Sequence, residues 1–181
     1  MFQTSNPVLL VIDCQVAIDH FSASGRSNPD AEIEISKLLE LWRARSLPII
    51  HVRHSSKSLK SPYHSSKETY EFKPEVFPRP DESIITKSEN CAFVDTSLHQ
   101  ELKSLNSSEL VICGVLTHHS IDATVRYACA VGFRVTVPSN ATASFPIAIS
   151  GGKVISSDLV QDIYLSNLNG EYCQVVENVS M

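Results

Sequence analysis

The sequence predicts an α/β protein with three layers, in which helices cover both faces of a six-stranded parallel sheet. Two observations predict this class. Six short, almost continuously apolar runs occur along the 181 residues, and stretches with a helical spacing of apolar residues separate most of them. Strands buried on both faces are continuously apolar, and strands that alternate with helices are typical of parallel sheets.

The first part of the chain is predicted to supply two strands and the helix between them. The apolar run 8–12 is predicted as a buried strand, and the run 47–52 (LPIIHV) as the next one. Between them, residues 30–45 carry apolar side chains at helical spacing among charged ones. Those apolar residues are Ile33, Leu38, Leu41 and Trp42.

The middle of the chain repeats this order with shorter elements. Runs 83–86 and 110–113 are predicted as strands. The segment 96–103 between them is predicted as a short helix, with Thr96 as its capping residue.

The last part of the chain continues the alternation. A helix is predicted over 118–131, ended by Gly132, and a strand follows over 133–137. A second helix, capped by Ser156 or Ser157, extends to residue 168 and precedes the last strand at 173–177.

One long segment breaks the alternation. Residues 53–82 are rich in Ser, Lys and Pro and show no clear period. Loops of this length inside a compact domain are usually functional or mobile. We therefore expect this segment to form part of the wall of a binding site.

The composition favours one domain spanning residues 1–181. The chain is 43% hydrophobic and 19% charged, enough for a single core. Its formal net charge of −5 and its scattered Lys and Arg residues argue against a nucleic-acid partner. No apolar stretch reaches the length of a membrane span. The apolar run near the start is interpreted as a strand and not as a signal peptide.

The cysteines argue against a disulfide framework or a zinc site. Their number is odd, and the positions 14, 91, 113, 129 and 173 match no zinc pattern. Reduced thiols of this kind are typical of the cytosol, so we expect a cytoplasmic protein.

Three polar residues stand at the ends of predicted strands. Asp13 directly follows the first strand, Lys87 follows the third, and Ser120 lies at the start of the helix after the fourth. Ligands bind beyond the carboxyl ends of the strands in open parallel sheets. We expect these three groups at one edge of the sheet, although polar residues at strand ends are common and mark a site only weakly.

Three motifs, in order, make the chemistry more specific. They are VIDCQ around Asp13, ITKSENCAF around Lys87, and GVLTHHSIDATVRYA over residues 114–128. Together they resemble the isochorismatase-like (cysteine) hydrolase family in order and spacing, over roughly residues 7–145.

The resemblance implies a fold, a catalytic set and an assembly. The fold would be a Rossmann-like parallel sheet without a cofactor, acting on a small-molecule substrate. Asp13 would be the general base and acid, Lys87 would tune it, and position 120 would hold the nucleophile. A cis peptide between Val115 and Leu116 is implied, with the N–H groups of Leu116 and residue 120 as an oxyanion hole. The family also implies a homo-oligomer, a dimer or a tetramer.

The sequence departs from the family at the nucleophile, because Ser120 stands where the family has cysteine. A serine hydroxyl is far less acidic than a thiol and needs a base during attack. Three explanations stay open: an engineered Cys-to-Ser change that inactivates the site, a serine that acts as the nucleophile, or a reaction without a nucleophile. Cleavage of the isochorismate vinyl ether by protonation is a reaction of the third kind.

Further residues are candidates for binding substrate. They are Gln15, Phe21, Arg53, His54, Phe72 and His119. Arg53 would suit an anionic substrate, although Arg53 and His54 could equally be a solvated strand end. No metal is expected, because the Asp-x-His element that metal-containing nicotinamidases of this superfamily carry after the second strand is missing from HVRHSS.

Two other functions remain as alternatives. The first is a catalytically silent protein of the same fold that binds a small molecule. The second, a flavodoxin-like nucleotide-binding protein, is disfavoured because no glycine-rich loop follows the first strand. Turnover of amide, ureide or isochorismate substrates would separate an enzyme from a binding protein.

Overall fold

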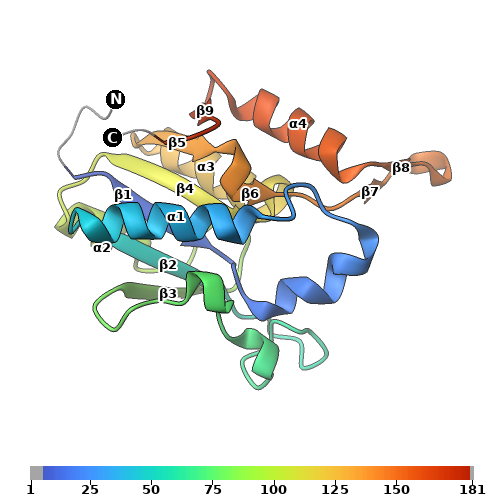
Figure 1. The fold of residues 1–181 in the computed structure, drawn as a ribbon, viewed down its shortest axis with the longest axis horizontal. Helices are drawn as coiled ribbons and strands as arrows, with labels where there is room; N and C mark the ends of the chain where they lie inside the picture. The colour runs from blue at the N-terminus through green and yellow to red at the C-terminus, as the bar shows by residue number, and fades with distance from the viewer. Residues whose placement is uncertain (1–5, 180–181) are drawn as a thin grey trace.

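A computed structural model of the chain describes residues 6–179. Its main sheet has the strand order β3-β2-β1-β4-β5-β9, with every pair parallel (Figure 1). The bounds are β1 Val8–Ile12, β2 Ile49–His54, β3 Ser83–Lys87, β4 Glu109–Val115, β5 Arg134–Pro138 and β9 Gln174–Val176. All six predicted strands are therefore confirmed.

Short strands add to this sheet and lie beside it. The strand β6 (Thr142–Ala143) pairs with the end of β4 and is the seventh member of the sheet. The strands β7 (Ile147–Ala148) and β8 (Val154–Ile155) form a separate antiparallel pair, which projects from one end of the molecule (Figure 1). None of these three strands is predicted from the sequence, since two residues are too few to show a period.

Within residues 6–179, four α-helices pack on the two faces of the sheet. They are α1 (Ala31–Ala44), α2 (Leu98–Ser104), α3 (Asp122–Ala130) and α4 (Ser157–Leu168). Apolar side chains of α1 form one core cluster with one face of β1, whereas those of α2, α3 and α4 form another with the opposite face. Figure 1 shows α1 lying along the sheet on the viewer's side. The predicted three-layer α/β class is confirmed.

The central strand β1 explains why its sequence is continuously apolar. Val8, Leu10 and Ile12 belong to the core under α2–α4, while Leu9 and Val11 belong to the core under α1. All five residues are fully buried. Since successive side chains point to opposite faces, a strand covered on both sides has no polar position.

Two helix starts differ from the sequence prediction. Ser97, not Thr96, is the residue before α2, while the Thr96 hydroxyl accepts a hydrogen bond from the Leu98 N–H and donates one to the Ala92 carbonyl. The helix predicted over 118–131 begins with a wider π-type turn, Thr117–Ile121, and continues as α3. At α4 the prediction is confirmed, because the Ser156 hydroxyl accepts from the Leu159 N–H.

The order of the strands places the site. The chain builds β1, β2 and β3 outward in one direction, then returns to the free side of β1 with β4. Ile12 pairs with Val52 of β2 on one side and with Gly114 of β4 on the other. A crevice for a ligand forms at such a reversal, beyond the carboxyl ends of the strands. Over residues 6–179, no helix is both long and apolar enough to cross a membrane.

Candidate active site

The three polar groups expected at the sheet edge lie in direct contact. The Lys87 ammonium donates to Asp13 Oδ2 at 2.7 Å and to Ser120 Oγ at 3.0 Å. The Ser120 hydroxyl donates to the same Asp13 oxygen at 2.6 Å. Lys87 is the last residue of β3 and not the residue after it. All three side chains are buried, so solvent screens their interactions little.

The environment of Asp13 leaves one of its oxygens free. Its backbone has a positive φ of 57° and its N–H donates to the Val52 carbonyl at 2.8 Å, which ties the residue to the end of β2. Oδ2 receives both Lys87 and Ser120, whereas Oδ1 is buried and meets no hydrogen-bond partner among the described residues. Oδ1 is thus an acceptor available to a bound molecule.

The end of β4 brings Ser120 to this carboxylate. Gly114 has a φ of +123°, and a Cβ there would lie 2.1 Å from the carbonyl oxygen of Ile12. Only glycine allows this approach of the two strands. The second peptide bond after Gly114, Val115–Leu116, is cis, as the resemblance implied. The Leu116 carbonyl then accepts from the N–H groups of His119 and Ile121, which starts the turn that carries Ser120.

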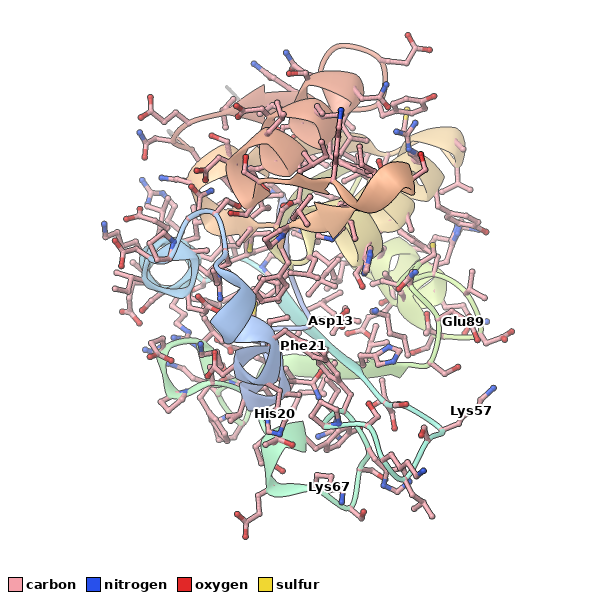
Figure 2. All side chains as sticks on the ribbon, turned by 90° about the vertical axis from the view of Figure 1, so that its right-hand side faces the viewer. Asp13, His20, Phe21, Lys57, Lys67 and Glu89 are labelled. Atoms are coloured by element: carbon pink, nitrogen blue, oxygen red, sulfur yellow. The ribbon has the colours of Figure 1, made fainter. Side chains whose placement is uncertain are left out.

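A cavity of about 540 Å³ opens beside these groups. Its wall includes Asp13 and Ser120 together with eight apolar residues and five other polar ones. The apolar residues are Ile18, Phe21, Val115, Leu116, Phe145, Pro146, Ile147 and Ala148, and the other polar ones are His54, Tyr63, Asn90, His118 and His119. Figure 2 shows Phe21, on the helical turn Val16–Ser24, near Asp13 at the end of β1.

Three of the six substrate-binding candidates line this cavity. They are Phe21, His54 and His119. The other three, Gln15, Arg53 and Phe72, are not among the lining residues. Phe72 is buried with its ring 5.6 Å from that of His51.

Gln15 supports the cavity wall although it does not line the cavity. Its side-chain amide nitrogen donates to the carbonyls of His54 and Tyr70, and its oxygen accepts from the His54 N–H at 2.7 Å. This buried side chain therefore joins the end of β1 to the start of the segment 53–82, at His54, and to its middle, at Tyr70. Its contacts position His54, which itself reaches the cavity.

Arg53 is directed away from the cavity by the alternation of β2. Ile50 and Val52 point into the core under α2–α4, so Arg53 lies on the other face and His54 on the same face as Val52. There the Arg53 guanidinium lies 4.7 Å from the ring centre of Tyr70, and its Nε donates to the Thr86 hydroxyl.

Several lining residues carried little signal in the sequence. Tyr63 lies in the segment 53–82, which was expected to form a wall but has no period that singles out one residue. Asn90 lies inside the Lys87 motif, and the run 145–148 follows the fifth strand as an unassigned apolar stretch.

The three histidines and Tyr63 of the wall are held in their neutral forms. Burial, with the neighbouring His119 ring, lowers the pKa of His118 to about 4. Burial also lowers the pKa of His119 and, against the pull of Asp13, that of His54. Tyr63, whose ring lies 5.6 Å from that of His54, has its pKa raised by burial and by Asp13. Near neutral pH these groups are uncharged. Within residues 6–179, no three His, Cys, Asp or Glu side chains are grouped as metal ligands.

Comparison with known proteins places this arrangement in a family. The model of the isochorismatase domain matches residues 7–149. An isochorismatase-family structure from Chromobacterium violaceum is similar with a TM-score of 0.93 and 42% identity, covering 97% of this chain and 91% of the other. The isochorismatase family protein YrdC of Bacillus subtilis is 33% identical over 93% of this chain and 90% of its own.

One relative with a stated activity is also similar. Streptothricin hydrolase of Streptomyces noursei is 31% identical over 149 residues, which are 80% of this chain and 57% of that protein.

Proposed function

This chain belongs to the isochorismatase family, a family of hydrolases that act on small molecules, and from that membership we propose its reaction. It cleaves an amide or ureide C–N bond of a small molecule with Asp13, Lys87 and Ser120 as its catalytic residues. Ser120 replaces the cysteine of the family and slows the reaction.

The observation that carries this proposal is the position of the Ser120 hydroxyl. It lies 2.6 Å from Asp13 Oδ2 and 3.0 Å from Lys87 Nζ, at the wall of the cavity. A nucleophile within hydrogen-bond reach of a base, with a third group that orients the base, is the arrangement that covalent hydrolysis requires. Lys87 also stabilises the charge on Asp13 between proton transfers.

The proposed reaction has two steps. Ser120 Oγ attacks the carbonyl carbon while its proton passes to Asp13, and the C–N bond breaks as Asp13 gives that proton to the leaving amine. Water then attacks the acyl ester, with Asp13 again as base, and the acid leaves with the Ser120 hydroxyl restored. The N–H groups of Leu116 and Ser120 would stabilise the oxyanion in both steps.

A second candidate reaction uses no nucleophile. Asp13 is the only carboxyl group among the described residues that line the cavity, so it could protonate a vinyl ether of the isochorismate type. A member that binds a small molecule without turnover is the remaining alternative.

Three substitutions test the proposal. Ser120→Cys should raise the release of ammonia from a panel of primary amides and ureides by about a hundredfold, because a thiol loses its proton to Asp13 more readily than an alcohol. Ser120→Ala should abolish amide cleavage, and Asp13→Asn should abolish both candidate reactions.

Iodoacetamide labelling supplies the control. The thiol of Ser120→Cys should react faster than native Cys91, whose pKa burial raises, and faster than the thiol of Ser107→Cys, at a buried serine that is not among the residues lining the cavity. A residue-120 thiol no faster than either, together with no gain in amide cleavage, would reject the nucleophile. Loss of vinyl-ether cleavage in Asp13→Asn alone would then identify the second reaction.

A further inference from the structure

We infer that the cavity selects an uncharged primary amide with an apolar or aromatic body and rejects anionic substrates. This inference rests on the proposed function, because it names the substrate of the same site. Its first basis is that the described residues lining the cavity offer no free positive charge.

Among residues 6–179, the Lys87 ammonium is the only cation in contact with the catalytic groups, and all its donors are engaged. It donates to Asp13 Oδ2, to Ser120 Oγ and to the Glu89 carbonyl, the last at 3.1 Å. An ammonium group has three N–H bonds, so none is left for a substrate carboxylate. Its charge is also balanced by that of Asp13.

The histidines of the wall do not replace that charge. His54, His118 and His119 all line the cavity. Partial removal from solvent lowers the pKa of each ring, so the neutral form is the stable one near pH 7. They can offer a ring N–H or a ring nitrogen to a substrate, but no ionic partner.

Arg53, the cation nearest in sequence to the wall, points to the opposite face of β2. Its guanidinium is placed over the Tyr70 ring and against the Thr86 hydroxyl. A substrate carboxylate inside the cavity would therefore lose its hydration without gaining a partner, which is strongly unfavourable. Vinyl ethers of the isochorismate type carry two carboxylates, so this wall disfavours them.

The unpartnered oxygen of Asp13 indicates what the substrate must supply. Oδ1 is buried and has no partner among the described residues, while Oδ2 is filled by Lys87 and Ser120. A buried carboxylate oxygen needs a donor. The NH₂ group of a primary amide supplies such a donor. Because the C–N bond joins this nitrogen to the carbonyl carbon, a hydrogen bond to Oδ1 would hold that carbon beside Ser120.

The rest of the wall accommodates an apolar body. The rings of Phe21 and Phe145 pack at an angle of 56° with their centres 6.3 Å apart, and Ile18, Leu116 and Ile147 are also among the apolar lining residues. A volume of about 540 Å³ accommodates a substituted ring. The three features together define the substrate class: one amide, one apolar body and no net charge.

Three matched probes test the inference. They are benzamide, the anion 4-carbamoylbenzoate and the cation 4-(aminomethyl)benzamide. Calorimetry on the Ser120→Ala variant at pH 7.5 should give benzamide a Kd at least about tenfold lower than that of the anion. The cation should also bind more weakly than benzamide, because the charge of Asp13 is already balanced. Binding of the anion as tight as that of benzamide, or no binding of any probe at about 10 mM, would overturn the inference.

A positive charge added to the cavity wall provides the opposite test, because it should favour the anionic probe. Ala148→Lys places a cation at an exposed lining position, and it should tighten binding of 4-carbamoylbenzoate about tenfold relative to Ala148→Gln, the uncharged control of similar size. Ammonia release by the parent protein is measured in parallel. Selective binding of benzamide without ammonia release would reject the proposed reaction and keep the substrate class. Ammonia release from the anion as fast as from benzamide would reject the substrate class and keep the reaction.

Discussion

The pKa values of the histidines that line the cavity depend more on burial than on hydrogen-bond partners. His118 is the clearest case, since its Nδ1 is buried without a hydrogen-bond partner among residues 6–179 and its ring lies 4.3 Å from that of His119. The folded protein therefore resists protonation of this ring, with its pKa at about 4. The unfolded chain takes up that proton at a pH of about 6.5.

This difference predicts a loss of stability in mild acid. Between a pH of about 6.5 and the folded pKa of about 4, the unfolded state binds more protons, so the free energy of unfolding falls as pH falls. The contribution of His118 is up to about 1.4 kcal/mol per pH unit. Urea unfolding at several pH values should show that the free energy of unfolding depends less on pH in His118→Asn than in the parent protein. A midpoint above pH 6 for the His118 ring in an NMR titration would contradict the prediction.

Gly114 shows how one absent side chain can determine a site. A Cβ there would overlap the Ile12 carbonyl at the residue before Asp13. Gly114→Ala should therefore lower the free energy of unfolding by about 3 kcal/mol or more, or prevent folding. Gly132→Ala is the control, because it also has a positive φ but nothing lies within 4 Å of its Cβ, and it should cost only about 1–2 kcal/mol. If urea unfolding shows equal losses of free energy for the two substitutions, backbone strain, and not the contact with the Ile12 carbonyl, causes the loss.

At the scale of elements, one carboxylate joins the segment between β2 and β3 to the rest of the fold. Glu82 accepts two hydrogen bonds from Arg43 of α1, one from the Arg79 N–H, and contacts His51 of β2 at 2.9 Å. Burial alone would raise the pKa of Glu82, but these donors outweigh it and hold the pKa at about 2. The segment that carries Tyr63 into the cavity wall is anchored by this contact at its far end.

Removing that charge should loosen the segment. Glu82→Gln is expected to lower the free energy of unfolding by about 2–4 kcal/mol, because it leaves Arg43 and His51 without their buried partner. Glu40→Gln removes the other carboxylate bound to Arg43, which is 65% exposed, and should change stability by less than about 0.5 kcal/mol. Similar effects of the two substitutions in thermal unfolding would refute a special role for Glu82.

At the scale of the whole molecule, the sheet was predictable and the cavity wall was only partly so. The six main strands are visible in sequence because both faces of the sheet are covered, as β1 illustrates. Asp13, Lys87 and Ser120 each follow a predicted strand. Their common position at one edge was predictable, since parallel strands end on the same side of the sheet.

The cavity wall depended on details that a sequence does not display. Arg53 and His54 are neighbours, yet the alternation of β2 sends one to Tyr70 and the other to the cavity. Which of the two faces the site follows from the register of β2 between β1 and β3. Gln15 was singled out by its motif, but its hydrogen bonds to the wall depend on where the segment 53–82 folds back.

The position of β1 between β2 and β4 also bears on how the chain is made by the ribosome. The two partners of β1 lie at very different distances, with Leu9 paired to Ile49 on one side and to Val111 on the other. A nascent chain that has emerged only as far as residue 100 therefore presents β1 with one side unpaired. That side exposes backbone donors and acceptors on a fully apolar strand, the kind of edge to which other chains can add. Pairing of β4 with β1 closes this edge and also brings Ser120 to Asp13, so the apolar edge of β1 is covered when the site forms.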